Sequence, residues 1–166
     1  MADSAEHLSN MNLSDFGMIY ISGGNTYKLL RELKSTSAMQ RIKDYLHGNG
    51  VVYGSSAGAI IFGQTIKTSS DNNSVNLIDL NGYNLVGDFS IAAHYTNKNE
   101  EKTKAATEKL IELSKNNSII ALPEEDSIVI NGNDIRIVGT CDYYIFKNGD
   151  RIQHQISDRC LNLSSL

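Results

Sequence analysis

Five consecutive residues, Gly54-Ser55-Ser56-Ala57-Gly58, match the Gly-x-Ser-x-Gly pattern in which many hydrolases carry a nucleophilic serine. The glycines have a steric purpose, because a serine on a sharp strand-to-helix turn leaves no room for side chains two residues before and after it. A strand-to-helix junction that carries glycines but has no catalytic role would show the same pattern. Here an apolar run over residues 51–53 precedes the turn and another over residues 57–62 follows it. That order makes Ser56 our candidate nucleophile.

Four histidines could supply the base that such a serine needs. His94 directly follows the apolar run 90–93, so it stands at the carboxyl end of a predicted strand, where open parallel sheets place their chemistry. The other three have simpler explanations: His7 lies in a polar arm, His47 at a helix end and His154 in a hairpin. His94 is therefore the best candidate base, and a histidine with a purely structural role is the alternative.

The acid that would orient this histidine is less clearly marked. Glu124 comes just after the predicted strand 118–122, again at a carboxyl end. Asp71 lies in the polar loop that follows the helix of the serine. For each of them an ordinary surface carboxylate is the alternative. The candidate acids are Asp71, Asp88, Glu124, Glu125 and Asp126.

A second glycine turn, Gly23-Gly24-Asn25, stands at another strand-to-helix junction. It is either a plain turn or a place where backbone N–H groups face an oxyanion. It differs from the dinucleotide-binding fingerprint, and the sequence has no Walker motif, so nucleotide binding has little support. The spacing of His, Cys and Asp suggests no metal site, and we expect no cofactor.

Strands alternate with helices over the first two-thirds of the chain. Residues 1–14 are a loose arm or a short helix, and residues 65–82 are a polar loop. Asn131-Gly132 and Asn148-Gly149 each predict a hairpin. We predict strands over residues 16–21, 51–53, 83–86, 90–93 and 118–122, and helices over 26–34 with Thr26 as its cap, 39–46, 57–62 and 98–115.

This order predicts an α/β fold with a doubly wound, mostly parallel sheet, helices on both faces and an antiparallel C-terminal tail. We expect a single domain over residues 1–166, since no linker or internal repeat divides the chain.

The composition argues against several classes of partner. The 166 residues carry a net charge of −4, so a nucleic-acid-binding surface is not expected. No apolar run approaches the roughly 18 residues that span a bilayer, and the first residues lack the basic and apolar regions of a secretory signal. For the two cysteines, Cys141 and Cys160, a reduced pair in the cytoplasm is a simpler interpretation than a disulfide.

Four segments stand in the order found in the peptidase E family: IYISGGNTYKLL, VVYGSSAGAIIFG, DFSIAAHY and IIALPEEDSIVI. Over roughly residues 16–147 the chain resembles this family of cytoplasmic aspartyl dipeptidases. They are serine hydrolases with a fold related to class I glutamine amidotransferases, and cyanophycinases are their relatives. The resemblance implies that Ser56 is the nucleophile, His94 the base and Glu124 the acid, with the N–H groups of Gly24 and Ala57 binding the oxyanion.

Two features depart from the family's pattern. Family members usually carry about two further strand-helix units before the Gly-Gly-Asn strand, whereas this chain begins almost at that strand. Apolar strands would then be exposed, so we expect a second copy of the chain to cover them in a homodimer. The family's preference for aspartate is linked to an arginine after the histidine, but residues 97–110 contain four lysines and no arginine. Lysine attracts a carboxylate without the bidentate fork, and we assign Lys104 to substrate binding together with Asn25 and Asp71.

The sequence thus predicts a serine peptidase that hydrolyses short peptides, dipeptides with an N-terminal aspartate above all. Two alternatives stay open. One is a catalytically impaired, N-terminally truncated member of the family that acts through assembly or binding. The other is an esterase or amidase that uses the same residues on a different acyl group.

Overall fold

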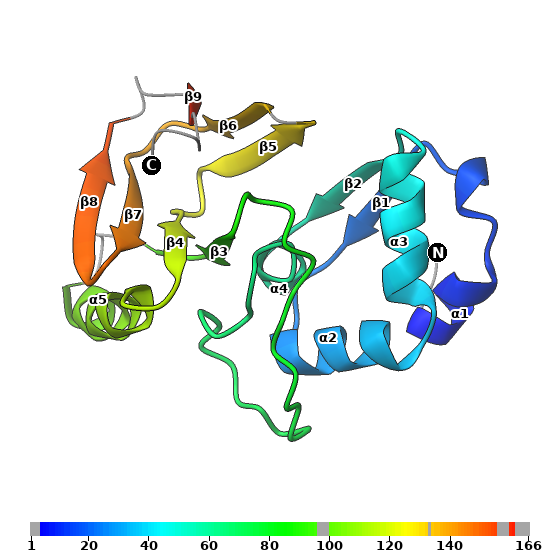
Figure 1. The fold of residues 1–166 in the computed structure, drawn as a ribbon, viewed down its shortest axis with the longest axis horizontal. Coiled ribbons are helices and arrows are strands. Elements are labelled where there is room, and N and C mark those ends of the chain that lie inside the picture. The colour runs from blue at the N-terminus through cyan, green and yellow to red at the C-terminus, as the bar shows by residue number, and fades with distance from the viewer. Residues whose placement is uncertain (1–3, 96–99, 133, 156–159, 162–166) are drawn as a thin grey trace.

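The computed structural model describes residues 4–95, 100–132, 134–155 and 160–161, and Figure 1 shows how their helices and strands are arranged. The N-terminal half places a pair of parallel strands beside helices, on the right of Figure 1. Its elements are α1 (Ala5–Asn10), the short 3-10 helix η1 (Leu13–Asp15), β1 (Met18–Ile21), α2 (Thr26–Ser35), α3 (Ala38–His47), β2 (Val51–Gly54) and α4 (Ala57–Ile60).

The C-terminal half consists of short strands and one long helix, on the left of Figure 1. Its elements are β3 (Phe89–Ala92), α5 (Glu100–Ser114), β4 (Ser118–Ala121), β5 (Ser127–Asn131), β6 (Asp134–Val138), β7 (Tyr143–Lys147), β8 (Asp150–His154) and β9 (Cys160–Leu161). The irregular segment between α4 and β3 runs beside both halves.

Local sequence accounts for the start and the buried side of α2. Leu30 and Leu33 recur at helical spacing, and both are buried. Asn25 caps the helix, because its side-chain oxygen accepts a hydrogen bond from a backbone N–H of the first turn at 3.0 Å. The predicted cap at Thr26 is wrong. Thr26 is the first helical residue, and its N–H and its hydroxyl both donate to Asp71.

The strands form three sheets instead of one. β1 and β2 pair in parallel; β3, β4, β7 and β8 form a mixed sheet in which only β3 and β4 are parallel; β5, β6 and β9 pair antiparallel. The α/β class is correct, but the described strands do not form the predicted doubly wound, mostly parallel sheet. Hairpin strands must pair antiparallel, and β7 takes the edge of β4 that faces away from β3. No described strand joins β2 to β3.

Both predicted hairpins are present, as β5–β6 and β7–β8. Their turns use residues that tolerate positive φ: Gly132 has φ 58°, and Asn148 and Gly149 have φ 56° and 85°. The predicted strand 83–86 is absent. Its backbone instead packs on the end of α4, where the N–H of Tyr83 donates to the carbonyl of Ile61 at 2.7 Å. The backbone N–H of Tyr83 is therefore not available for pairing with a neighbouring strand.

The central strand β4 is buried on both faces. Ile120 and Leu122 face one hydrophobic cluster, which β5 and β6 help to cover. Ile119 and Ala121 alternate with them and face a second cluster, which α5 covers. The residues that follow β4 therefore leave a rigid part of the molecule, and Glu124 is among them.

The outer face of β1 and β2 has no cover among the described residues. Side chains alternate along both strands, so that Ile19 and Ile21 are buried against the helices while the opposite face points to solvent. Tyr20 and Tyr53 stack there with ring centroids 5.5 Å apart. The large apolar or aromatic side chains exposed on this outer face are Met18, Tyr20, Val51 and Tyr53.

We expect this outer face to pack against the same face of a second copy. It carries no charged side chain, so two copies can meet about a two-fold axis without repulsion, and each Å² of apolar surface removed from water contributes about 25 cal/mol. Light scattering should then give twice the 18.3 kDa of one chain. Val51→Lys should yield monomers, whereas Ile152→Lys on the exposed strand β8 should not. A folded wild-type monomer at micromolar concentration would contradict the expected dimer.

Candidate active site

Ser56 occupies the turn between β2 and α4 with φ 53° and ψ −115°, a conformation that is costly for a residue other than glycine. The neighbouring glycines have the steric role expected from the sequence. A Cβ added to Gly54 would lie 2.2 Å from the carbonyl oxygen of Gly58. A Cβ added to Gly58 would lie 2.2 Å from the carbonyl oxygen of Ile21. The packing of three chain segments thus holds the Ser56 hydroxyl at the carboxyl end of β2.

Ser56, His94 and Glu124 form a continuous row of hydrogen bonds. The Nε2 atom of His94 lies 2.8 Å from the Oγ atom of Ser56, and its Nδ1 atom lies 3.1 Å from the Oε1 atom of Glu124. Nδ1 must carry the ring proton if Nε2 is to accept the proton of the serine hydroxyl. In that tautomer Nδ1–H donates to Glu124. The structure therefore brings together the three residues that the resemblance implied.

Backbone hydrogen bonds between the segments after β3 and β4 hold His94 beside Glu124. The N–H of Leu122 donates to the carbonyl of Ala92, and the N–H of Tyr95 donates to the carbonyl of Leu122, both at 2.9 Å. His94 itself has φ 61°, which turns its side chain away from the direction of the strand. The parallel pairing of β3 and β4 thus continues just far enough to bring imidazole and carboxylate together.

This row of side chains is open to water. The His94 side chain is 55% exposed and that of Glu124 is 73% exposed. Solvent screens an exposed carboxylate, so Glu124 acts on the imidazole less strongly than a buried acid would.

Two of the other candidate acids lie elsewhere. Asp126 is buried, and its Oδ1 atom accepts the backbone N–H groups of Thr140 and Cys141 at 2.9 and 3.1 Å. Asp126 therefore ties the loop after β4 to the turn that follows β6. Asp88 accepts a hydrogen bond from the side chain of Asn84 at 2.8 Å. The alternative histidines lie in α1, α3 and β8.

The turn Gly23-Gly24-Asn25 packs against Ser56. A Cβ added to Gly23 would lie 3.2 Å from the Cβ atom and 3.6 Å from the Oγ atom of Ser56. Gly24 has φ 141°, a conformation that favours glycine. Within the described part of the chain, the N–H groups of Gly24 and Ala57 have no hydrogen-bond acceptor. Both N–H groups are thus free to donate to an anionic oxygen, which is one requirement of an oxyanion hole.

Asp71 contacts the beginning of α2 instead of the histidine. Its Oδ2 atom accepts from the N–H and the hydroxyl of Thr26, both at 2.7 Å, and from the hydroxyl of Ser69 at 3.0 Å. The side-chain amide of Asn25 donates to the carbonyl of Asn72 at 3.0 Å. The loop after α4 therefore holds the Gly23-Gly24-Asn25 turn at two points, and Asp71 is not the acid that orients His94.

The contacts of Asp71 predict a pH-dependent contribution to stability. Burial raises the pKa of this carboxyl, but the hydrogen bonds from Thr26 and Ser69 outweigh it and hold the pKa below its ordinary value. A lowered pKa in the folded state stabilises the fold above the unfolded-state value of about 3.9, and this stabilisation is lost as the pH falls through the folded-state pKa. Asp71→Asn should therefore lower the Tm at pH 7, and the gap to wild type should shrink below about pH 4. Circular dichroism melts from pH 3 to 8 measure it, and a gap that is equal at every pH would contradict the assignment.

Lys104 and Lys109, both on α5, have different surroundings. Lys104 is exposed, and its side chain has no hydrogen bond to the described residues. Lys109 extends its amine to the carbonyls of Ser69 at 2.6 Å and Thr68 at 3.4 Å. The sequence analysis did not single out Lys109, because nothing near it in the sequence distinguishes it from the other lysines of a charged helix.

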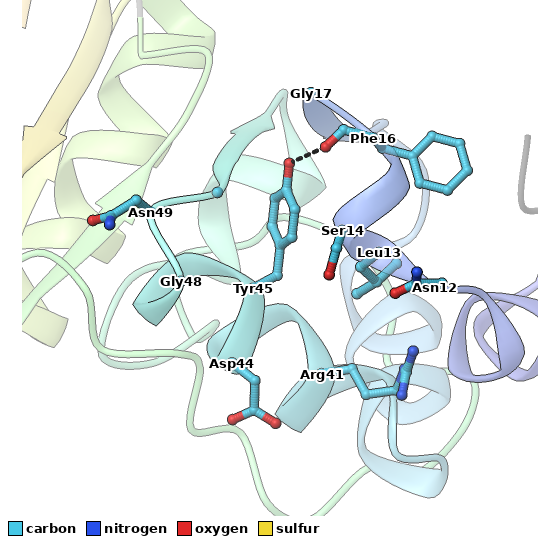
Figure 2. Close-up of a pocket in the computed structure, with 11 residues that line it drawn as sticks. Asn12, Leu13, Ser14, Phe16, Gly17, Arg41, Asp44, Tyr45, Gly48 and Asn49 are labelled. Atoms are coloured by element: carbon cyan, nitrogen blue, oxygen red, sulfur yellow. Dashed lines mark hydrogen bonds between the residues drawn. The ribbon is translucent and has the colours of Figure 1, made fainter.

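A separate hollow of about 550 Å³ lies at the amino ends of β1 and β2, away from Ser56. Gly17 and Gly50, which directly precede the two strands, form part of its wall. Figure 2 shows Tyr45 standing across it, with its hydroxyl donating to the carbonyl of Phe16 at 2.8 Å. Because the serine stands at the other end of β2, this hollow is not part of the candidate active site.

Other kinds of site find no support in the described residues. In the ranges listed above, no three His, Cys, Asp or Glu side chains gather where they could hold a metal ion. None of the helices described is both long enough and apolar enough to cross a membrane. Cys141 carries a free thiol.

Comparison with protein families supports what the site geometry suggests. The model of peptidase family S51 matches residues 1–138. The chain belongs to this family. A peptidase E from Nostoc sp. (strain PCC 7120) is 34% identical to this chain over 141 residues, which cover 81% of this chain and 57% of the relative. A peptidase E from Salmonella arizonae is 29% identical over 140 residues, or 80% of this chain and 60% of the relative.

Solved structures show the same architecture. A candidate peptidase E from Listeria monocytogenes superposes with a TM-score of 0.66 at 29% identity, covering 83% of this chain and 66% of that one. A peptidase from an acI-B1 actinobacterium gives a TM-score of 0.69 at 20% identity, covering 93% and 65%, and supports the fold alone. The chain thus spans less than two-thirds of the length of the two curated relatives above.

Proposed function

We propose that this S51 chain is a serine peptidase that hydrolyses short peptides in the cytoplasm. The observation that carries the proposal is the row of two hydrogen bonds that links Glu124 to His94 and His94 to Ser56. Nucleophile, base and orienting acid stand in contact in the order that acyl transfer needs. The neighbouring amides of Gly24 and Ala57 supply the remaining requirement, which is a site for negative charge on the carbonyl oxygen.

The reaction divides into two acyl transfers. Ser56 Oγ attacks the peptide carbonyl carbon while His94 Nε2 takes its proton, and the carbonyl oxygen becomes an oxyanion bound by the N–H groups of Gly24 and Ala57. The carbon–nitrogen bond then breaks, and His94 gives its proton to the departing amine. Water attacks the acyl-serine next, with His94 as base again, and the acid product leaves as Ser56 regains its proton. Glu124 stabilises the imidazolium in both halves.

An activity-based probe tests this proposal directly. A fluorophosphonate forms a covalent bond to the oxygen of an activated serine and releases fluoride. Mass spectrometry of the labelled chain should place the adduct on the tryptic peptide that contains Ser56. Prior denaturation should abolish the labelling. If the folded protein does not react, the chain is not an active serine hydrolase, and the impaired alternative applies.

The substrate side of the proposal concerns dipeptides with an N-terminal aspartate. A lysine near the site attracts a carboxylate as a point charge, and Lys104 on the exposed side of α5 is available for it. Lys104→Met should raise the KM for Asp-X dipeptides by up to about fivefold, since an exposed ion pair contributes at most about 1 kcal/mol, and leave the KM for Ala-X dipeptides unchanged. Steady-state kinetics on both series measure the difference. Equal effects on the two series would remove Lys104 from the substrate site.

A further inference from the structure

Segment 68–72, in the loop between α4 and β3, is tied to three different elements of the fold. The hydroxyl of Thr68 donates to the carbonyl of Ile91 in β3 at 2.5 Å. The amine of Lys109 in α5 donates to the carbonyl of Ser69 at 2.6 Å. At its other end the segment is tied to the start of α2 through Asp71 and Thr26. These contacts join stretches of chain 23 to 45 residues apart.

Two of the residues that segment 68–72 contacts, Ile91 and Thr26, lie close in the sequence to candidate catalytic groups. Ile91 stands three residues before His94 on the same strand and turn. Thr26 stands three residues after Gly23, which packs against Ser56. Segment 68–72 therefore spans from the strand that carries the base to the turn that would bind the oxyanion.

The surroundings of Lys109 are unusual for a lysine. Its amine contacts backbone carbonyls, and no carboxylate of the described residues lies within ion-pair distance. Lys109 is exposed as a whole residue, but its amine lies against two backbone carbonyls, and desolvation there lowers the pKa of the amine. A lysine on the solvated face of a helix would avoid this cost by remaining extended in water. The hydrogen bonds from the Lys109 amine therefore restrain the backbone of Thr68 and Ser69.

We propose that Lys109 and Thr68 are positioning residues, which brace segment 68–72 and thereby hold the Gly23-Gly24-Asn25 turn at a fixed distance from His94. Ser69 transmits the restraint, because its hydroxyl donates to Asp71 and lies 3.0 Å from the hydroxyl of Thr26. Ser69 and Thr26 are both buried, so the connection is short and shielded from water.

The catalytic part of this inference rests on the proposed peptidase function. The Gly24 amide must lie where the oxyanion forms, and a displacement of about 1 Å can cost up to a hundredfold in rate. Binding of the uncharged ground-state carbonyl depends on that amide much less. Loosening the brace should therefore lower kcat while KM changes little.

Hydrogen exchange and kinetics on Lys109→Met test the brace. The substitution keeps the length of the side chain and removes its donors. Amides of residues 22–28 should exchange about tenfold faster than in wild type, while those of β7 should not change. The kcat for a short peptide should fall about tenfold, with KM within about twofold. Lys109→Arg, which keeps a donor, should restore most of both properties.

Lys67→Met is the matched control. Lys67 is exposed in the same loop, one residue before Thr68, and its amine has no hydrogen bond to the described residues. The control removes the same charge and should change neither exchange nor kcat. Thr68→Val, with Thr68→Ser as its conservative partner, cuts the second tie and decides the matter if Lys109→Met does not fold.

The two readouts separate the brace from the proposed function. Unchanged exchange over residues 22–28 in Lys109→Met and Thr68→Val would overturn the brace, whatever the activity. Faster exchange with an unchanged kcat would overturn its role in positioning for catalysis. If wild type neither turns over peptides nor reacts with the fluorophosphonate, the proposed function fails, and exchange alone still decides whether the brace exists.

Discussion

Ser56→Ala should abolish peptide hydrolysis and leave the fold intact. The variant lacks the oxygen that attacks the carbonyl, and losing the nucleophile of a triad lowers kcat by about 10⁵-fold or more. The small remaining rate would come from binding and from the amides of Gly24 and Ala57, which the substitution does not touch. Alanine keeps the same backbone strain at φ 53°, so the Tm should change by only a few degrees. Hydrolysis of Asp-X and Ala-X dipeptides, followed by amine release, measures the loss.

Ser55→Ala is the matched control for this prediction. Ser55 neighbours the candidate nucleophile, and its hydroxyl lies 2.8 Å from the hydroxyl of Tyr20 on the exposed face of β1. Its loss should change kcat by no more than about threefold, because an exposed hydrogen bond contributes little. If Ser56→Ala retained wild-type turnover in a preparation free of other peptidases, Ser56 would not be the nucleophile.

The three residues of the hydrogen-bonded row could be predicted because each follows a strand. Ser56, His94 and Glu124 come after β2, β3 and β4, and each of these strands reads as an apolar run that ends at a turn residue. Strands β3 and β4 pair in parallel, so their carboxyl ends meet at one edge. The strand pattern therefore placed His94 and Glu124 at one edge, whereas Ser56, which follows β2 in a different sheet, came from its glycine pattern, and the family resemblance selected Glu124 among the candidate acids.

The contacts of Asp71 could not be predicted in the same way. The sequence placed it beside the elbow as a possible acid or substrate ligand, but its partners Thr26 and Ser69 lie 45 and 2 residues away. A side-chain contact across a polar loop leaves no periodic signal, unlike the apolar spacing of a helix. Lys109 escaped notice for the same reason, since its contact with Ser69 spans 40 residues.

Sheet pairing was the other part that local pattern left undecided. Apolar runs predicted nearly every strand, and the Asn-Gly steps predicted both hairpins. The pairing of these strands depends on contacts between segments that are far apart in the sequence. The segment 83–86 has the composition of a strand, but the carbonyls at the end of α4 bind its N–H groups first. Tertiary contacts of this kind override local propensity.

Glu124→Gln should lower kcat by about a hundredfold, less than the loss of about 10⁴ seen when the buried acid of a protease triad is replaced in this way. The amide can hydrogen-bond to the imidazole through its NH₂ group, which favours the tautomer with its proton on Nε2, and His94 then cannot accept the proton of Ser56. The glutamine also lacks the charge that stabilises the imidazolium. The 73% exposure of Glu124 limits the effect, because water replaces part of that stabilisation. Stopped assays on one dipeptide, with kcat and KM fitted separately, provide the measurement.

The neighbouring carboxylates make this prediction specific. Glu125→Gln removes the same charge one residue further along, and it should change kcat by no more than about threefold, since Glu124 is the residue whose carboxylate is hydrogen-bonded to His94 Nδ1. Asp71→Asn should lower kcat only through the glycine turn, because Asp71 contacts Thr26 and Ser69 instead of the imidazole. A mild effect of Glu124→Gln together with an effect of Asp71→Asn as severe as that of Ser56→Ala would mean that the acid acting on His94 is Asp71.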